Sequence, residues 1–351
     1  MLYFLFFSNG FEQSRESELR RISEFKIVDS YRNSIIASAP AGLEKKVTKA
    51  KPIFLYSIFP ISATAKINED EYLVSIYELC KKAIGRRCAG SIRAECLDLN
   101  SKRGYSAKDI EVYIGKRLEQ DGFSVDLENP DFFLYLVLMN MEGYAGCRRY
   151  AELSRSYLEP FRHYGHKYKV SRSELKLAEA FDEFGIKAKG GVALDIGAAP
   201  GGWSLFMALH GFRVIAIDKG SLDYDAIKKA GVQVKVVEDG KEAGKLLKKF
   251  EILHIKFDAA KVNLKGISGI SLMANDANLQ PGESCGLMGG FYRNMGKDSE
   301  IIMTVKCATR NVESYIEKAR DSIGDGWQVK RIMALPSNRQ EVTLHAAMKN
   351  K

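Results

Sequence analysis

The alternation of apolar and polar positions predicts a mixed α/β protein over the first 140 residues. The chain opens with a strand-like run at 2–7. Leu19, Ile22 and Phe25 then recur at helical spacing within 14–25, and 26–39 is extended again. A second group of elements follows, predicted as a helix at 72–84, a strand at 91–97, a helix at 106–121 and a strand at 132–139. Both groups have an α+β arrangement.

A second pattern begins near residue 190, where a short apolar run is bounded by glycines. Residues 192–196 have the character of a buried parallel strand, and a helix is under way by 205–209. Another strand at 214–217 ends in Asp218. This strand, turn, helix and strand predict a nucleoside-binding βαβ unit, in which an acid ending the second strand accepts hydrogen bonds from ribose hydroxyls.

The turn inside this unit carries the most specific motif of the chain, D-I-G-A-A-P-G-G-W-S from Asp195 to Ser204. Its glycines remove β-carbons that would hold a ligand away from the backbone, and the helix behind them offers free N–H groups. The G-x-G-x-x-G spacing of dinucleotide enzymes is absent. A carboxylate at Asp195 would repel a pyrophosphate but suits the cationic amino-acid end of S-adenosylmethionine, so the motif favours that cofactor over a dinucleotide. The predicted contacts are Asp195, Gly197, Ala198, Ala199, Pro200, Gly201, Gly202, Trp203 and Asp218.

Length and composition narrow the class of protein. At 351 residues, with 46% hydrophobic and 28% charged residues, the chain predicts a globular protein of two or three domains. No apolar run approaches the ~20 residues that cross a bilayer, and the opening MLYFLFF has no basic residue before it, so we expect a cytoplasmic protein. The six cysteines show neither CxxC nor zinc spacing, which predicts reduced, mostly buried thiols and no metal.

The net charge of +9 favours a polyanionic partner, and its distribution is more informative than its sum. Between Cys147 and Arg172, seven lysines and arginines face only two glutamates, and five tyrosines and phenylalanines are interleaved with them. Cations for phosphates and rings for unpaired bases are what single-stranded RNA binding requires. For any single aromatic residue of this segment, packing of its ring on a neighbouring domain is an equally simple explanation. The candidate RNA contacts are Arg148, Arg149, Arg155, Arg162, Lys167, Lys169 and Arg172.

The ten residues from Asp195 to Ser204 resemble the FtsJ-like ribose 2′-O-methyltransferases. That resemblance implies a Rossmann-like domain, S-adenosylmethionine as methyl donor, and a catalytic Lys-Asp-Lys-Glu tetrad. Its members match Lys176 in SRSELKLAEAF, Asp258 in EILHIKFD, Lys306 in IIMTVKC and Glu341 in SNRQEVTLHAAMK. The proline-containing turn usual after the aspartate is replaced here by D-A-A-K. The adenine would lie after the third strand, near Asp239 or the adjacent Glu238, with Asp258 also beside the cofactor.

The earlier part of the chain resembles the THUMP domain, an RNA-binding module that follows a ferredoxin-like domain in its relatives. The strings CAGSIRAECLDLN and VDLENPDFFLYLVL carry this resemblance. Together the two resemblances imply a ferredoxin-like domain at 1–60, a THUMP domain at 61–150, a basic aromatic linker at 151–170 and an FtsJ-like domain at 171–351. They imply ribosomal RNA as substrate, with cytidine as the nucleoside, although transfer RNA is also compatible. Residues 264–295 correspond poorly and are expected to be an insertion over the cleft, or a helix and turn.

We expect Lys306 to act as general base toward a ribose hydroxyl, with its pKa lowered by burial or by Lys176, while Asp258 and Glu341 orient the lysines. Base methylation is the main alternative, but FDAAK is unlike the Asn-Pro-Pro-Tyr turn of guanine methylation. Cys307 also lacks the Pro-Cys context of carbon-5 methylation. A non-catalytic RNA-binding protein and a dehydrogenase are the remaining alternatives.

Overall fold

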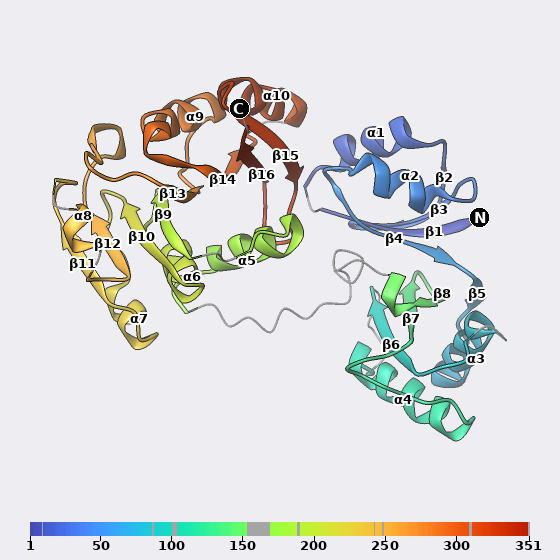
Figure 1. The fold of residues 1–351 in the computed structure, drawn as a ribbon. Helices are drawn as coiled ribbons and strands as arrows, with labels where there is room; N and C mark the ends of the chain where they lie inside the picture. Colours follow the sequence, from blue (N-terminus) through green and yellow to red (C-terminus); the bar gives the residue numbers. More distant parts are fainter. Residues whose placement is uncertain are drawn as a thin grey trace. The chain divides into compact units, whose positions relative to one another are not determined.

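The structure is a computed structural model that describes residues 1–8, 10–85, 88–99, 104–152, 169–187, 190–241, 243–247, 249–308 and 311–349. The chain forms two compact units, residues 1–164 and residues 165–351 (Figure 1). Among the described residues, no helix has both the length and the apolarity that crossing a membrane requires.

The first sheet of the N-terminal unit has ferredoxin-like topology. Its strand order is β2-β3-β1-β4, and each adjacent pair is antiparallel. The first helix ends at Ile22 rather than Phe25, because the Ser23 N–H caps the Leu19 carbonyl and the chain turns extended there. The elements are β1 (Leu2–Phe7), α1 (Glu12–Ile22), β2 (Lys26–Tyr31), β3 (Ser34–Ser38), α2 (Leu43–Ala50) and β4 (Leu55–Ile61).

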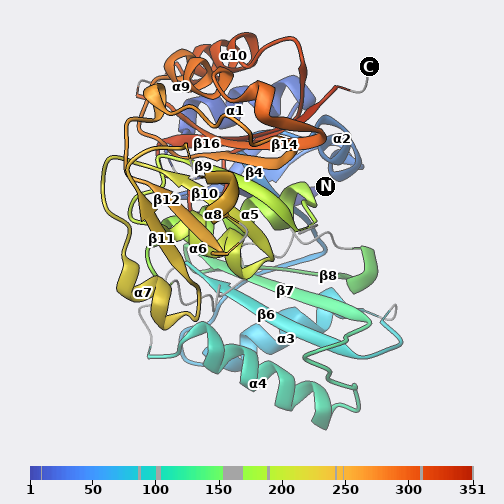
Figure 2. The same ribbon diagram turned by 60° about the vertical axis from the view of Figure 1, so that its left-hand side comes forward.

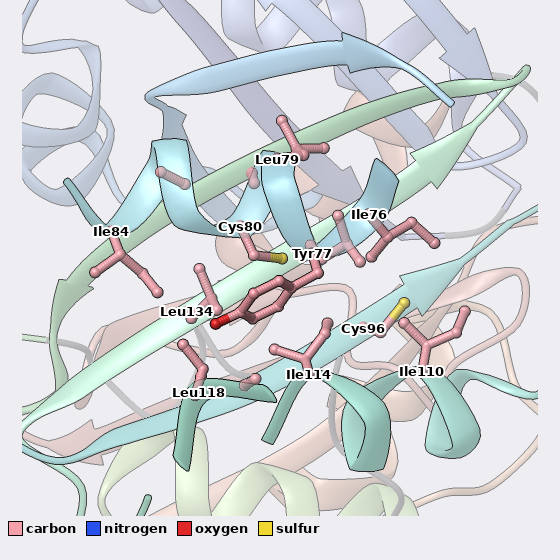
Figure 3. Close-up of a cluster of buried hydrophobic side chains, with 14 of the residues drawn as sticks. Ile76, Tyr77, Leu79, Cys80, Ile84, Cys96, Ile110, Ile114, Leu118 and Leu134 are labelled. Atoms are coloured by element: carbon pink, nitrogen blue, oxygen red, sulfur yellow. The ribbon is translucent and has the colours of Figure 1, made fainter. Parts of the chain in front are cut away.

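The second sheet of this unit is built from residues 63–149 and has the order β5-β8-β7-β6. Helices α3 and α4 share a core with one face of it, into which Tyr77, Cys80, Ile114 and Leu134 project (Figure 3). Ser106 and Asp109 form a capping box that starts α4. The elements are β5 (Ala63–Lys66), α3 (Tyr72–Ile84), β6 (Ile92–Asp98), α4 (Ala107–Gln120), β7 (Phe132–Met139) and β8 (Glu142–Arg149).

Strand β7 explains why the predicted run at 132–139 is apolar at every position. All eight of its residues are buried, because alternate side chains face opposite layers. Leu134 and its same-face neighbours pack with α3 and α4, whereas Phe133 and Tyr135 pack against Phe59 of the first sheet, with the Phe59 and Tyr135 ring centroids 4.6 Å apart. The two sheets therefore share a core and form one compact unit (Figure 2).

The C-terminal unit is an α/β domain around an eight-stranded sheet of order β11-β12-β10-β9-β13-β14-β16-β15. The strands from β11 to β14 run parallel, and β16 lies antiparallel to both β14 and β15. Helices α5 and α6 lie on one side of the sheet, and α9 and α10 lie on the other (Figure 1). The elements are α5 (Ser173–Phe184), β9 (Gly191–Ile196), α6 (Gly202–Leu209), β10 (Phe212–Ile217), α7 (Tyr224–Lys229), β11 (Val234–Val237), α8 (Ala243–Leu246), β12 (Ile252–Ile255), β13 (Ile270–Asn275), α9 (Pro281–Gly289), β14 (Met295–Lys306), α10 (Val312–Ser322), β15 (Trp327–Met333) and β16 (Glu341–Met348).

The strand order corrects one expectation about this unit and shows where its ligand crevice lies. Residues 264–295 are not an insertion, because they contain β13, which lies between β9 and β14, and helix α9. Strand β11 is an edge strand outside β12, so β12 is the strand that neighbours β10. The sheet reverses its direction of growth between β9 and β13. In open α/β sheets the crevice beyond the carboxyl ends at such a point is where ligands bind.

Candidate active site

Four ionisable side chains converge at the carboxyl ends of β13 and β14. The Lys306 Nζ lies 2.5 Å from Glu341 Oε2 and 2.9 Å from Asp276 Oδ1. The Lys176 Nζ lies 2.5 Å from Glu341 Oε1 and 3.3 Å from Asp276 Oδ2. We call Lys176, Asp276, Lys306 and Glu341 the ionic cluster. Its two cations alternate with its two anions, so each charge contacts only opposite charges in the cluster.

Sheet register brings three of these residues together. Lys306 ends β14 and is the direct antiparallel partner of Glu341, the first residue of β16. Asp276 follows Asn275, the last residue of β13, which is the other neighbour of β14. The Asn275 side chain accepts a hydrogen bond from the Ala277 N–H at 2.9 Å, which shapes the turn that presents Asp276.

Asp258, the predicted aspartate of this site, does not lie in the ionic cluster. Asp258 lies beyond β12, where its carboxylate pairs with the exposed Lys219 at 3.1 Å and accepts from the Ala260 N–H. The reason lies in the strand order. Because β11 is an extra edge strand, β12 lies beside β10, and β13 is the strand that lies between β9 and β14. Asp276 occupies the expected place. Its sequence signal is an apolar run at 270–275 that ends in Asn-Asp before the helix-starting Pro281.

The electrostatics of the cluster also differ from the expectation for Lys306. Burial acts to lower the pKa of Lys306, but Asp276 and Glu341 raise it by more, so its pKa is above the ordinary lysine value. Burial likewise acts to raise the pKa of Asp276, but the two lysines and the Thr304 hydroxyl, which donates to Oδ1 at 2.7 Å, bring it below the ordinary value. The net shift of the Lys306 pKa is therefore upward, opposite to the predicted lowering by burial or by Lys176.

Helix α5 holds Lys176 through contacts with the motif helix α6. The Trp203 indole N–H donates to the Ser173 carbonyl at 2.7 Å, and the Trp203 side chain is buried. Ser171 and Glu174 have the sequence spacing of a capping box, but only half of the box forms. Glu174 accepts from the Ser171 N–H at 3.1 Å, but the Ser171 hydroxyl contacts Ser173 rather than capping the helix. Trp203 therefore serves the site by fixing α5 to α6.

Two glycines of the motif are required by the packing of the protein itself. At Gly197, where φ is +74°, a β-carbon would lie 2.8 Å from the Ala277 Cα. A β-carbon at Gly202 would lie 2.5 Å from the Ser171 hydroxyl oxygen. The missing β-carbons thus let the motif loop approach the turn after β13 and the start of α5. This approach brings the motif beside the ionic cluster.

Two acids of the motif region fit a cationic nucleoside cofactor. Asp195, at 1% exposure, accepts from the Ser204 hydroxyl at 2.6 Å through Oδ2, while its Oδ1 is buried without a hydrogen-bond partner. Such an unpartnered acceptor suits the ammonium of S-adenosylmethionine. Asp218 directly follows β10 and accepts from the Ala199 and Gly220 N–H groups at 3.0 Å and 2.7 Å. A carboxylate has lone pairs left for ribose hydroxyls after two such bonds.

Burial raises the pKa of the Asp195 carboxyl to about 7 and nearby Asp276 and Asp218 add to the effect, although Ser204 opposes it. Because this pKa exceeds that of the unfolded chain, about 4, the folded state binds the proton more tightly. This tighter proton binding at Asp195 stabilises the folded state fully below about pH 4, and the stabilisation is lost as the pH rises through 7. Relative to wild type, Asp195→Asn should therefore gain about 3 kcal/mol of unfolding free energy between pH 5 and 8. Urea unfolding of both proteins across that range checks this, and parallel pH profiles would contradict it.

The other predicted contacts lie in different places. Asp239 follows the edge strand β11, is exposed, and pairs with Lys241 at 3.1 Å. Asp258 follows β12, the strand beside β10, so it is better placed than Asp239 or Glu238 to approach an adenosine bound over β10. In the motif, Gly197 and Ala198 donate their N–H groups to the Ile217 carbonyl at the end of β10, and Ala199 donates to Asp218. Pro200 is exposed, and Gly201 is the N-cap of α6.

The predicted RNA contacts fall on both units. Arg148 and Arg149 end β8, and the Arg149 guanidinium lies 5.6 Å from the centroid of the Phe132 ring. Lys169 and Arg172 are exposed just before α5. Arg155, Arg162 and Lys167 lie outside the described residues. All six cysteines are free, and four of them, including Cys307, are buried.

The sheet order, the glycine-rich turn after β9 and the acids at the strand ends define the second unit as a Rossmann-like methyltransferase domain, of the class that uses S-adenosylmethionine. Residues 169–264 match the FtsJ-like methyltransferase family. That match includes Lys176 and the motif, and it ends before Asp276, Lys306 and Glu341.

Similar proteins agree with this class. The chain is 31% identical over 163 residues to the ribosomal RNA large subunit methyltransferase M of Shewanella sp. strain W3-18-1, which covers 43% of this chain and 45% of that protein. It is 24% identical over 274 residues to the protein of the same name from Pseudomonas syringae pv. tomato, covering 73% and 70%. An uncharacterized protein of Methanocaldococcus jannaschii is 30% identical over 151 residues, covering 42% and 36%. The first and third alignments span less than half of the relatives' own lengths.

Proposed function

We propose that this protein transfers a methyl group from S-adenosylmethionine to a ribose 2′-hydroxyl of RNA. The observation that carries the proposal is the ionic cluster, because it places a lysine between two carboxylates at the ligand-binding edge of a methyltransferase sheet. A hydroxyl is a poor nucleophile, and a base that accepts its proton during attack is what the reaction requires. Bound S-adenosylmethionine supplies an electrophilic methyl group, and Asp195 and Asp218 are the residues that would hold it.

Lys306 is the residue that accepts the proton. At rest it is an ammonium, because Asp276 and Glu341 raise its pKa, so the reactive form must first lose a proton. Once neutral, Lys306 is a strong base, since the same two carboxylates stabilise the ammonium that forms when it takes the hydroxyl proton. Lys176 binds the Glu341 oxygen opposite Lys306 and contacts both oxygens of Asp276 at 3.3 Å, which helps to fix the two carboxylates. Alignment of hydroxyl and methyl carbon supplies much of the remaining acceleration.

Ribosomal RNA is the favoured substrate, and transfer RNA is the second candidate. Two of the similar proteins are named as ribosomal RNA large subunit methyltransferases. Arg148 and Arg149 of the N-terminal unit and Lys169 and Arg172 before α5 would contribute cations for the phosphates. The sheet at residues 63–149 would act as a THUMP-like RNA-binding module, and cytidine is the nucleoside implied by resemblance.

The proposal is tested by transfer of labelled methyl from S-adenosylmethionine to separated ribosomal and transfer RNA fractions, followed by nucleoside analysis. The expected product is a 2′-O-methylated nucleoside from ribosomal RNA. Label on a base would instead establish base methylation. Binding of both cofactor and RNA without transfer to any fraction would establish a non-catalytic protein.

A further inference from the structure

The loop between β15 and β16 carries a buried amide beside the ionic cluster. Asn338 is 6% exposed and lies three residues before Glu341. Its Oδ1 accepts from the Leu335 N–H at 2.6 Å and from the Thr343 hydroxyl at 3.1 Å. Its Nδ2 donates to Glu341 Oε1 at 3.3 Å. The amide therefore bridges its own loop, the following strand and one carboxylate of the cluster.

The two donors on Oδ1 fix which end of the amide faces Glu341. A flipped amide would direct NH₂ at the Leu335 N–H and the Thr343 hydroxyl, and its oxygen at a carboxylate. Neither set of contacts is favourable, because the backbone N–H has no acceptor and two oxygens would repel. The orientation that donates to Glu341 is therefore the one that the surroundings select.

The loop itself is anchored to the helix that carries Lys176. Ser337 donates to the buried carboxylate of Glu179 through both its N–H, at 2.9 Å, and its hydroxyl, at 2.6 Å. Glu179 lies three residues after Lys176 on α5, close to one helical turn. Asn338 is thus held in a fixed place relative to both Lys176 and Glu341.

We propose that Asn338 is a positioning residue for methyl transfer, which holds the Glu341 carboxylate so that each of its oxygens binds a different lysine. Oε1 receives Lys176 and Asn338, while Oε2 receives Lys306. If Glu341 rotated, Lys306 would lose one of the two carboxylates that orient it. This inference rests on the proposed function, and it assigns a role to a residue that does not itself face the substrate.

Asn338→Asp tests the proposal, because it keeps both acceptor contacts of Oδ1 and replaces only the donor by a second acceptor. In the variant, a negative charge faces Glu341. The charged groups around Lys306 are Lys176, Asp276 and Glu341, with the buried thiol of Cys307 adjacent in sequence. We expect kcat to fall at least tenfold at pH 8. The dissociation constants of S-adenosylmethionine and RNA should change less than twofold, and the rising limb of the kcat/KM pH profile should move to higher pH.

Gln340→Glu is the matched control, since it adds the same charge to the same loop on an exposed side chain. Its kcat and pH profile should stay within twofold of wild type. A titration of the lysine side-chain carbons by NMR, in the cofactor-free protein, reads the Lys306 pKa without methyl transfer. That pKa should rise in Asn338→Asp and remain unchanged in Gln340→Glu.

If Asn338→Asp has the same kcat, the same pH dependence and the same Lys306 pKa as the wild-type protein, the inference is overturned and the proposed function remains intact. A wild-type protein that methylates no RNA would overturn the proposed function, while the NMR titration would still decide whether Asn338 acts on the cluster. If Asn338→Asp does not fold, Thr343→Val replaces it, because loss of that hydroxyl loosens the amide. We then expect kcat to fall about threefold, and an unchanged kcat and titration would overturn the inference.

Discussion

Lys306→Arg should lower kcat for methyl transfer by about 10²- to 10⁴-fold, the range that a general base contributes. The guanidinium retains the positive charge that Asp276 and Glu341 require, so the buried carboxylates keep a cationic partner and the domain should fold. Arginine cannot lose its proton in a protein, so it cannot accept one from a hydroxyl. Single-turnover methyl transfer and calorimetric binding of S-adenosylmethionine to the variant measure the two effects separately.

Wild-type kcat/KM should accompany this result by rising close to tenfold per pH unit from neutral into alkaline pH. The reason is that Lys306, with its raised pKa, is mostly an ammonium in that range and only its neutral form is reactive. Lys306→Arg should lose this dependence together with its activity. A variant that keeps more than a tenth of wild-type kcat would show that Lys306 is not the base.

Asp276→Asn is expected to lower kcat by at least about 10²-fold, whereas Asp258→Asn should keep kcat within a few-fold of wild type. Asp276 contacts both lysines and receives the Thr304 hydroxyl, so its loss leaves two buried ammonium groups with one carboxylate. Among the described residues, Asp258 pairs with the exposed Lys219 and with its own loop, and its place beside β10 makes it a candidate for cofactor affinity. Its substitution should therefore appear in the KM for S-adenosylmethionine.

The two variants form a matched pair, because each exchanges one aspartate for its amide at the carboxyl end of a parallel strand. Steady-state kcat and KM for both substrates, with unfolding midpoints to confirm folding, distinguish them. The reverse pattern, with kcat lost in Asp258→Asn and kept in Asp276→Asn, would restore Asp258 as the aspartate of the site and refute the cluster as the reaction centre.

Much of the fold could be read from local sequence because its signals are local. The apolar run at 2–7 and the helical spacing at 72–84 and 106–121 each coincide with an element of the structure. The same holds for Lys306 and Glu341, which stand at the end and the start of recognisable strands. Boundaries were less certain where a buried side chain such as Phe25 continued a helical pattern beyond the helix.

The sequence by itself determined the methyltransferase motif, the alternation of elements and three of the four cluster residues, because each is marked by residues close to it in the chain. Only the tertiary structure decided that Asp276 rather than Asp258 completes the cluster. Strand order depends on which edge of the sheet β11 and β12 join, and no local pattern encodes it. The sequence likewise does not predict the raised pKa of Lys306 or the orientation of Asn338. The raised pKa arises from side chains 30 or more residues away, and the orientation arises from a loop whose shape the fold imposes.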